Sequence, residues 1–396
     1  MSLDQSTGVY YDPYDVGINA DPYPVFRRLR DEAPVYYNPE HDFYAVSRYD
    51  DVERGLVDRD HFSNARSDVL EFIKAGVEFP PGIFIFEDPP LHTVHRGLIA
   101  RVFTPRKMAA IEPQVRDYCV RVLDALAGRD RFDFVRDLGA EMPMRVIGML
   151  LGIPEDDQAA IRDHIDANLR TDEGQPLSDT SSLSGDMFAD YIDWRTEHPS
   201  DDLMTELLNA EFEDETGTVR RLGREEILTY VNILAGAGNE TTTKLIGWAG
   251  KVLADHPDQR RLLVEDPGLI PGAVEELLRY EPPGPHVARY VTRDATFEGG
   301  TVPEGSALLC LVGSANRDER HWDDPDAFDV RRRAAGHLTF SYGIHFCLGA
   351  ALARLEGRVA LEEVLKRFPE WTVDEAEAKL ASTSTVRGWE SLPVSV

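Results

Sequence analysis

The sequence predicts a mainly α-helical protein with a minor β component. Apolar residues recur at helical spacing through long stretches that begin near Leu91 and dominate the rest of the chain. Patterns typical of strands are confined to about residues 1–60 and 289–312. The 396 residues are 42% apolar, enough for a large core, and no linker or internal repeat divides them. We therefore expect a single domain over residues 1–396, in which a small β-containing part joins a helical remainder.

The first 130 residues predict short elements of both kinds. Residues 24–31 and 50–59 have helical periodicity, and residues 43–47 alternate as a strand does. Thr104 is placed to cap a helix that begins with Pro105, because proline lacks an N–H that the first helical turn would leave unpaired. Pro113 restarts the pattern, which predicts a longer helix to about residue 126.

Helical patterns dominate the middle of the chain. We expect helices over residues 141–151, after Pro154, and from a cap at Asp201 or Asp202 to about residue 211. The longest helix should cover residues 224–255 and span roughly 48 Å at about 1.5 Å per residue.

The last third contains two more predicted helices and the second group of strands. A helix over residues 272–280 ends before a pair of prolines, and strands follow over residues 289–312 with a turn at Gly299 and Gly300. The last long helix should run over residues 347–368.

Charge and cysteine content exclude several classes of protein. The formal net charge is −29, which argues against nucleic acid or an anionic membrane surface as a partner. The most apolar long stretch, residues 231–254, contains three charged residues and is not expected to span a bilayer. The N-terminus lacks the basic and apolar regions of a signal peptide, and three widely spaced cysteines fit a reducing compartment. We expect a cytoplasmic protein without a membrane anchor.

The charge is unevenly distributed. Residues 151–230 contain 21 acidic and 6 basic side chains, whereas residues 92–107 contain four basic and no acidic ones. Residues 331–358 contain five arginines and one glutamate. This pattern is either local fluctuation on a solvated acidic surface or a basic face that attracts an acidic partner.

The segment around Cys347 is the most informative part of the chain. An isolated cysteine is most often a small buried hydrophobe. Here, however, Cys347 lies where a loop meets a predicted helix, whose N–H groups and dipole can stabilise a thiolate. Gly343 and Gly349 remove side chains where the loop would lie flat against a macrocycle. No CxxC pair or histidine cluster offers a zinc site, which needs three or four protein ligands.

The loop resembles the haem-binding signature of the cytochromes P450. Phe340, Gly343, Cys347 and Gly349 occupy every fixed position of that signature, and resemblance to the family extends over nearly the whole chain. It implies the cytochrome P450 fold, with a long central helix crossing over haem b (iron protoporphyrin IX) and a proximal loop that provides Cys347 as axial ligand. A thiolate ligand pushes electron density onto the iron and favours O–O cleavage.

Haem carries two carboxylates, which a buried site must pair with cations or hydrogen-bond donors. His92 and Arg96 lie four residues apart and share one face of a helix. Alone they would be an ordinary surface pair, but the segment resembles the family's propionate-binding helix. The resemblance adds Arg289 and His345 to this set. His95 is expected to face outwards.

Glu276 and Arg279 form an acid–base pair at i, i+3, which means little in isolation. In the family this pair joins an arginine from the stretch before the cysteine loop. Arg332 has the matching spacing, and we choose it over Arg331. The resemblance gives these residues a structural role.

The long helix contains a family-like oxygen-binding segment. Apolar residues flank Glu240 and Thr241, and polar groups placed among them tend to be functional. The resemblance implies that Ala237 and Gly238 leave room above the haem. It also implies that Thr241 hydrogen-bonds to the activated oxygen and that Glu240 helps to deliver protons to it. This intact acid–alcohol pair favours a monooxygenase that uses O₂.

Residues 67–86 are rich in apolar side chains and resemble the loop that covers the distal pocket in the family. With residues 231–237, 283–287 and 384–386 they predict a hydrophobic substrate of steroid, terpenoid or fatty-acid type. The candidate pocket residues are Val69, Phe72, Phe79, Ile83, Phe84, Ile233, Leu234, Val287, Thr385 and Val386.

We therefore predict a haem-thiolate monooxygenase that hydroxylates a hydrophobic small molecule with O₂. By the family fold, both basic segments lie near the cysteine side of the haem, where an acidic ferredoxin could dock and deliver electrons from its reductase. Two alternatives remain: a haem protein that binds ligands without turnover, and a helical interaction protein without haem. Intact Glu240 and Thr241 argue against the first, and the cysteine loop argues against the second.

Overall fold

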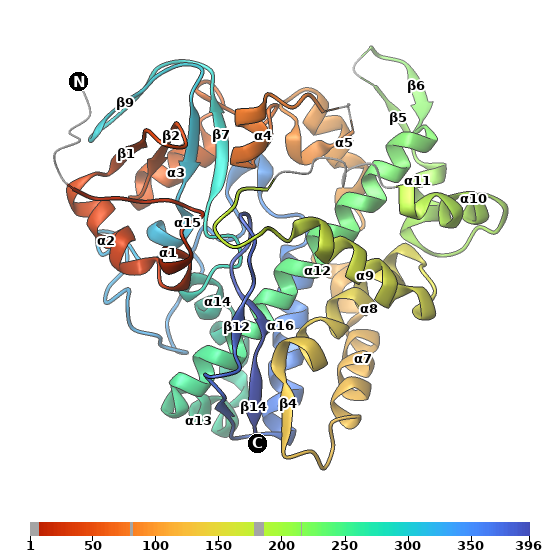
Figure 1. Ribbon diagram of the computed structural model, residues 1–396. Helices are drawn as coiled ribbons and strands as arrows, with labels where there is room; N and C mark the ends of the chain where they lie inside the picture. Colours follow the sequence, from red (N-terminus) through yellow and green to blue (C-terminus); the bar gives the residue numbers. More distant parts are fainter. Residues whose placement is uncertain (1–7, 80–81, 178–185, 215) are drawn as a thin grey trace.

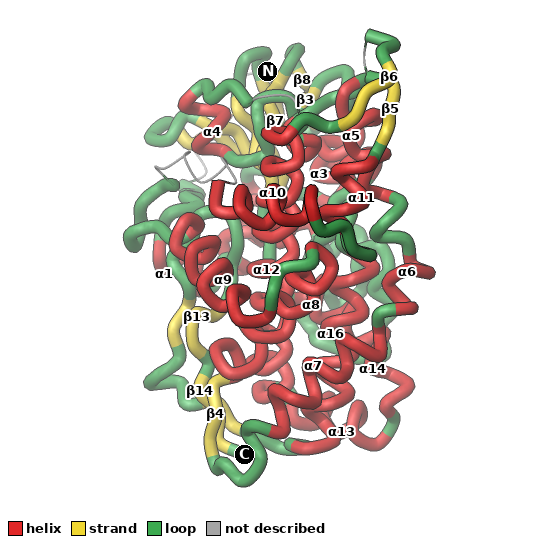
Figure 2. Tube along the Cα trace, turned by 90° about the vertical axis from the view of Figure 1, so that its right-hand side faces the viewer, coloured by secondary structure: helices red, strands yellow, loops and turns green. Residues whose placement is uncertain are grey.

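The computed structural model describes residues 8–79, 82–177, 186–214 and 216–396. The N-terminal residues, for which no signal peptide is predicted, lie outside these ranges. Helices form most of the molecule, and strands gather at its two ends (Figures 1 and 2). The predicted class, mainly α with minor β, is confirmed.

The helices, including several of only one or two turns, have the following bounds: α1 Val16–Ala20, α2 Tyr23–Glu32, α3 Tyr49–Val57, α4 Leu70–Ala75, α5 Leu91–Ala100, α6 Pro105–Ala110, α7 Glu112–Asp124, α8 Glu141–Leu151, α9 Glu155–Leu169, α10 Ala189–Glu197, α11 Leu203–Asn209, α12 Arg224–Asp255, α13 Pro257–Glu265, α14 Ile270–Tyr280, α15 Val312–Ala315 and α16 Ala350–Arg367.

The strands are short and have the following bounds: β1 Val35–Asn38, β2 Phe43–Val46, β3 Phe62–Ser63, β4 Arg131–Asp133, β5 Glu211–Glu213, β6 Val219–Arg221, β7 Val287–Val291, β8 Ala295–Phe297, β9 Gly300–Val302, β10 Ala307–Cys310, β11 Thr372–Val373, β12 Lys379–Leu380, β13 Trp389–Ser391 and β14 Pro393–Ser395.

Several predicted elements have the predicted bounds. Helices α8 and α12 cover residues 141–151 and 224–255. The Thr104 side chain accepts a hydrogen bond from the Lys107 N–H at the start of α6, and Asp202 caps α11 through the Thr205 N–H. Helix α12 continues through Gly236 and Gly238 without a break.

The larger sheet joins strands from two distant parts of the chain. Its order is β1-β2-β10-β7-β3, in which β2 and β10 run parallel and the other neighbours are antiparallel. Residue Leu309 of β10 lies opposite Ala45 of β2 on one side and Ala288 of β7 on the other. The sheet places β7, and with it Arg289, beside the cavity described below.

A second sheet lies at the opposite end of the molecule and was not predicted. It has the order β11-β14-β4, and its antiparallel β4–β14 pair sets Asp133 opposite Pro393 (Figure 1). Asp133 also accepts hydrogen bonds from the Leu392 N–H at 3.0 Å and from the Ser391 hydroxyl at 2.5 Å. The C-terminal strand is thus fixed to the middle of the chain.

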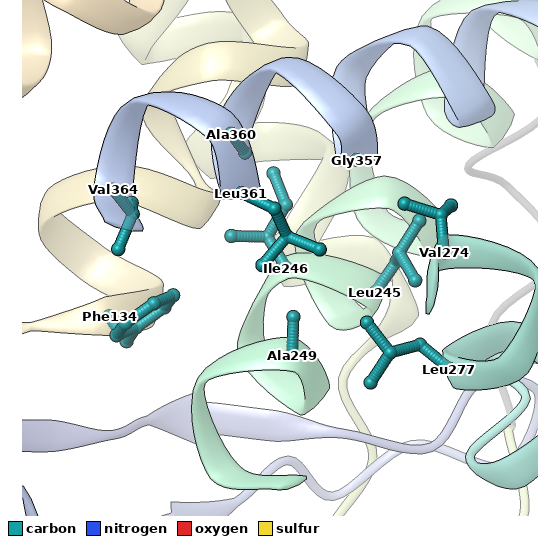
Figure 3. Close-up of a pocket in the computed structure, with 10 residues that line it drawn as sticks. All are labelled: Phe134, Leu245, Ile246, Ala249, Val274, Leu277, Gly357, Ala360, Leu361 and Val364. Atoms are coloured by element: carbon teal, nitrogen blue, oxygen red, sulfur yellow. The ribbon is translucent and has the colours of Figure 1, made fainter. Parts of the chain in front are cut away.

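The core beneath the site forms where α12, α14 and α16 meet. Figure 3 shows apolar side chains from these helices and Phe134 converging around a cavity of about 10 Å³. A Cβ atom added at Gly250 of α12 would lie 2.7 Å from the Phe134 ring, so glycine permits this close approach. Dense packing of this kind gives the site rigid walls.

Among the described helices, none combines the length and apolar character that a bilayer crossing would need.

Candidate active site

Cys347 lies in the loop that leads into α16. Its N–H donates a hydrogen bond to the Phe340 carbonyl at 2.7 Å, which closes the loop. Helix α16 begins at Ala350, so Cys347 lies in the loop before it and not at the predicted helix start at residue 347.

The Cys347 thiol is exposed, but the surface on which it is exposed is the wall of a large cavity. Burial within the protein raises the pKa of this thiol, whereas the Gly349 N–H and the positive charge of Arg96 lower it. A metal cation deprotonates a coordinated thiol outright. The position therefore suits a metal ligand better than a free nucleophile.

The two loop glycines serve different purposes. Gly343 has a left-handed backbone, with φ at +71°, and a Cβ added there would lie 3.3 Å from Val57 of α3. It is needed for the turn and does not line the cavity. At Gly349, which does line the cavity, an added Cβ would meet only the Cys347 sulfur at 4.0 Å.

The cavity lies between the cysteine loop and the middle of α12. Its volume is about 280 Å³. Its lining is mostly apolar. Thirteen of the candidate residues line it: Cys347, Arg96, Arg289, His345, Phe340, Gly349, Ala237, Gly238, Thr241, Phe84, Ile233, Leu234 and Val287.

On the α12 side, the Thr241 hydroxyl donates to the carbonyl of Ala237 at 2.9 Å. This bond holds the hydroxyl against the helix, with the residue at the cavity wall. The small residues one turn before this position, Ala237 and Gly238, leave the helix surface open there.

Glu240 points away from the cavity into a buried polar cluster. One carboxylate oxygen lies 3.5 Å from the Lys244 ammonium, and the other is buried without a partner. Asp166 of α9 belongs to the same cluster and accepts a hydrogen bond from the Asn239 amide at 3.2 Å. Burial raises the pKa of Glu240 and of Asp166, and the charge of Lys244 opposes this in both.

Cationic and imidazole groups gather at one rim of the cavity. Arg96, Arg289 and His345 line it, and the His92 ring packs behind His345 with ring centroids 4.3 Å apart. Burial, followed by the charge of Arg289, lowers the pKa of His345 to about 3. The His345 Nε2 and both His92 ring nitrogens are buried without hydrogen-bond partners. Buried polar atoms of this kind call for a ligand or water.

These features fit a flat, metal-containing cofactor with anionic substituents. The thiol can hold the metal, the apolar walls can enclose the ring, and the unpaired rim groups can bind carboxylates. Arg96 also donates to the carbonyl of Phe346, so the rim is tied directly to the cysteine loop.

Several candidate residues lie outside the described lining. His92 and Gly343 stand behind it, and Glu240 faces the polar cluster. Six candidate substrate-pocket residues are not among the residues that line the cavity: Val69, Phe72, Phe79, Ile83, Thr385 and Val386. Phe72 and Ile83 are buried in the core.

The sequence did not single out Asp68, Asn64, Phe103, Ile147 or Leu352, which all line the cavity. The nearest signal was the apolar stretch of residues 67–86, called the lid segment below, in which Asp68 is the first of three carboxylates.

The Glu276–Arg279 pair is fully buried and bidentate, with distances of 2.7 and 2.8 Å. Arg332 joins it through its Nε, 3.1 Å from a Glu276 oxygen, and donates to the carbonyls of Asp323 and Asp324. Arg331 is exposed and bonds Asp329 only through its backbone N–H. The structure thus places Arg332, and not Arg331, in the cluster.

The prediction that His95 faces outwards is wrong. Its side chain is only 1% exposed, and its Nδ1 lies 2.8 Å from both oxygens of the buried Glu87 carboxylate. The helix turns this residue towards the lid segment, where the acid compensates for the burial of a polar ring.

The fold and the cavity together fit the class of mainly helical proteins in which one cysteine can hold a flat metal cofactor. Comparisons with known proteins agree. The family model for "Cytochrome P450" matches residues 268–391. The putative cytochrome P450 123 of Mycobacterium tuberculosis is 40% identical, over 97% of this chain and 96% of the relative. The vitamin D(3) 25-hydroxylase of Pseudonocardia autotrophica is 35% identical, over 100% and 99%.

Among solved structures, CYP109E1 from Bacillus megaterium in complex with testosterone superposes with a TM-score of 0.84 at 29% identity, covering 96% of this chain and 98% of that one. The chain belongs to the cytochrome P450 family. It is a cytochrome P450 monooxygenase, and the family implies a haem-thiolate cofactor.

Proposed function

We propose that this enzyme uses O₂ and two electrons from a separate redox protein to hydroxylate a hydrophobic small molecule, with haem b as its cofactor. One observation carries the proposal. The Cys347 thiol and the Thr241 hydroxyl line the same large, mostly apolar cavity. When bound, a haem with a thiolate ligand supplies the cleavage of the O–O bond.

The residues at the cavity have distinct roles in this proposal. Cys347 holds the iron, and Arg96, Arg289 and His345 bind the two haem carboxylates. The His92 ring packs against His345 and supports its position. Its own ring nitrogens have no partner and can bind a haem carboxylate.

Thr241 and Glu240 deliver protons. The Thr241 hydroxyl stands at the wall, where it can donate to an oxygen atom in the cavity once it rotates away from the Ala237 carbonyl. Glu240 is its neighbour in the chain, and its raised pKa lets the carboxyl hold a proton that an ordinary glutamate would release. The cluster reaches Asp166 on α9, whose carboxyl also has a raised pKa, so protons can pass from α9 towards α12.

An apolar substrate fits the distal wall. Phe84, Ile233, Leu234 and Val287 present hydrocarbon to the cavity. Relatives whose printed names concern vitamin D(3) and testosterone support a steroid-like substrate, and terpenoids and fatty acids are the other candidates. The alternative, ligand binding without turnover, is disfavoured by the Thr241 hydroxyl at the wall and the acid beside it.

A ferredoxin-type donor is proposed for electron delivery. A groove lined by α6 and α16 brings the two basic segments together on the cysteine side. Arg354 and Arg358 are neutralised there by Glu275 and Glu112. The free positive charge comes instead from exposed residues that make no ion pair within the described chain, such as Arg101 and Arg106.

We keep a cytoplasmic location as part of the proposal, supported by cysteines that are free throughout the described chain.

Three measurements test the proposal. The purified protein should bind haem and give the red-shifted ferrous–CO absorption of a thiolate ligand, and Cys347→Ala should abolish that absorption. A panel of steroids, terpenoids and fatty acids should produce a spin-state shift with at least one class. With NADH, ferredoxin and its reductase, that compound should be hydroxylated. The proposal would be contradicted if the Cys347→Ala variant kept the red-shifted ferrous–CO absorption. It would also be contradicted if the wild type formed no product.

For the electron donor, charge reversal of Arg101 and Arg106 to Glu should slow reduction by ferredoxin at low salt. Arg293→Glu, an exposed arginine between β7 and β8, is the matched control. Equal reduction rates for the two variants would argue against this docking face.

A further inference from the structure

Asp68 gives the cavity a negative charge that the proposed function does not use. It follows β3 and lies at the cavity wall, near enough to Arg289 for the charge of that residue to act on it. Among the described lining residues it is the only carboxylate. The cavity lining as a whole is mostly apolar, so this charge is a distinctive feature of the site.

The protein holds Asp68 in a fixed position. Its carbonyl accepts a hydrogen bond from the Ala288 N–H of β7 at 2.7 Å. The preceding residue, Ser67, is buried and has a left-handed backbone, with φ at +93°. Its hydroxyl accepts from the Val69 N–H at 3.1 Å. A non-glycine residue in such a conformation costs about 1–3 kcal/mol and persists only where surrounding contacts enforce it.

The Asp68 carboxylate has no side-chain partner. No side chain of the described chain hydrogen-bonds to it or forms an ion pair with it within the usual 4 Å. The residue is partly exposed and lines the cavity, where a ligand can reach it. Burial raises the pKa of Asp68, and the charge of Arg289 is the main effect that opposes this.

The assignment of Arg289 to the haem carboxylates leaves Asp68 without compensation. One guanidinium would then be shared among several anionic groups. An unpaired charge that is largely removed from water is strongly unfavourable unless a cation or a proton balances it. A ligand that carries a positive charge would supply that balance.

We propose that Asp68 selects substrates that carry a cationic nitrogen at one end of an otherwise apolar skeleton. The substrate class is therefore an amphipathic amine, whose hydrocarbon contacts Phe84, Ile233 and Val287 while its charge pairs with Asp68. This inference rests on the proposed function, because it places the ligand in the distal part of the same cavity.

The test uses the haem-loaded protein and two ligands with the same hydrocarbon chain. Decyltrimethylammonium is a cation without a lone pair, so it cannot coordinate iron, and 1-decanol is its neutral counterpart. Dissociation constants are measured by equilibrium dialysis and by the change in the Soret absorption. The wild type should bind the cation about tenfold more tightly, which corresponds to about 1.4 kcal/mol.

Asp68→Asn should remove this preference and leave the affinity for 1-decanol within about twofold, whereas Asp68→Glu should retain part of it. Glu78→Gln is the matched control. It also removes one negative charge from the same segment, but Glu78 is exposed and is not among the residues that line the cavity. Equal binding of both ligands by the wild type would overturn the inference, as would a preference that survives Asp68→Asn. Weaker binding of both ligands by Asp68→Asn would also overturn it, because that result indicates a general structural role.

The two proposals fail separately. Dialysis needs neither reduction nor turnover, so the absence of product would contradict the proposed function without changing the ratio of affinities. Active enzyme that binds both ligands equally would contradict only the role of Asp68.

Discussion

Nδ1 of His95 lies 2.8 Å from both carboxylate oxygens of Glu87, and both side chains are almost fully buried. Glu87 also accepts a hydrogen bond from the Gly82 N–H at 2.7 Å. The pair therefore fastens the lid segment to α5, the helix that carries Arg96 to the cavity.

Removing either member of this pair should destabilise the protein more than removing both. His95→Leu leaves the Glu87 carboxylate buried with a single backbone donor, at an expected cost of about 3–5 kcal/mol. The double variant His95→Leu, Glu87→Met replaces the pair by hydrocarbon and should recover most of this loss. Urea denaturation of the four proteins gives the coupling free energy. The exposed His164→Leu should stay within about 0.5 kcal/mol of the wild type. A double variant as unstable as the worse single variant would contradict the interpretation.

Glu240→Gln should impair proton delivery without affecting haem binding. Because the amide cannot release a proton, product formation should fall by about 100-fold and the solvent deuterium isotope effect should change. The ferrous–CO absorption should be unchanged, because Glu240 is not among the residues that line the cavity. Asp163→Asn, an exposed acid on α9, is the control. An unchanged rate with an unchanged isotope effect would exclude Glu240 from the relay.

Neighbouring arginines provide a test of the buried cluster. Arg332→Met removes hydrogen bonds to Glu276, Asp323 and Asp324, and we expect a loss of about 2 kcal/mol with lower haem occupancy. Arg331→Met should change stability by less than about 0.5 kcal/mol. Thermal unfolding and the haem-to-protein absorbance ratio measure both effects, and equal losses for the two variants would refute the assignment.

Acid should weaken the network between α7 and α16. Hydrogen bonds from Arg358 and Arg116 lower the pKa of Glu112 to about 2. Although burial alone would raise it, hydrogen bonds from Lys366, Arg116 and Arg367 lower the pKa of Glu363 to about 2. Both folded-state values lie below the ordinary value of 4.5, so the stabilisation is present above about pH 4.5 and is lost as the pH falls towards 2.

Glu363→Gln tests this pH dependence. At neutral pH the variant should be less stable by up to about 3 kcal/mol, the free energy that corresponds to the lowered pKa. The difference between variant and wild type should shrink steadily between about pH 5 and pH 2. A difference that stays constant over this range would show that the carboxylate charge is not the source of the stability.

The long helices could be predicted from the sequence because their signals are local. Helix α12 combines acidic residues in its first turn with an apolar pattern over its whole length, and Thr104–Pro105 is a local capping signal. The sheet of β4, β11 and β14 could not be predicted, because strands of two or three residues show no periodicity. Their pairing depends on tertiary contacts between distant segments.

The residues of the site also fall into those that local sequence signals predict and those that depend on tertiary contacts. Cys347 and Arg332 lie in motifs with fixed spacing, so their positions could be read from the chain. The orientation of the lid could not, because apolar side chains suit the core and the cavity wall equally. Phe84 lines the cavity, while Phe72 and Ile83 pack into the core. His95 was misplaced for a related reason, since its burial depends on Glu87 in a separate segment.

The β4–β14 pair has a consequence for how the chain is made. Asp133 bonds to Leu392, a partner 259 residues farther along, which a ribosome at about 5–20 residues per second synthesises many seconds later. Until then β4 has no partner strand in β14, and the helices that follow β4 must assemble around an incomplete sheet. Nascent chains released before β14 is synthesised should therefore engage chaperones far more than chains that contain it.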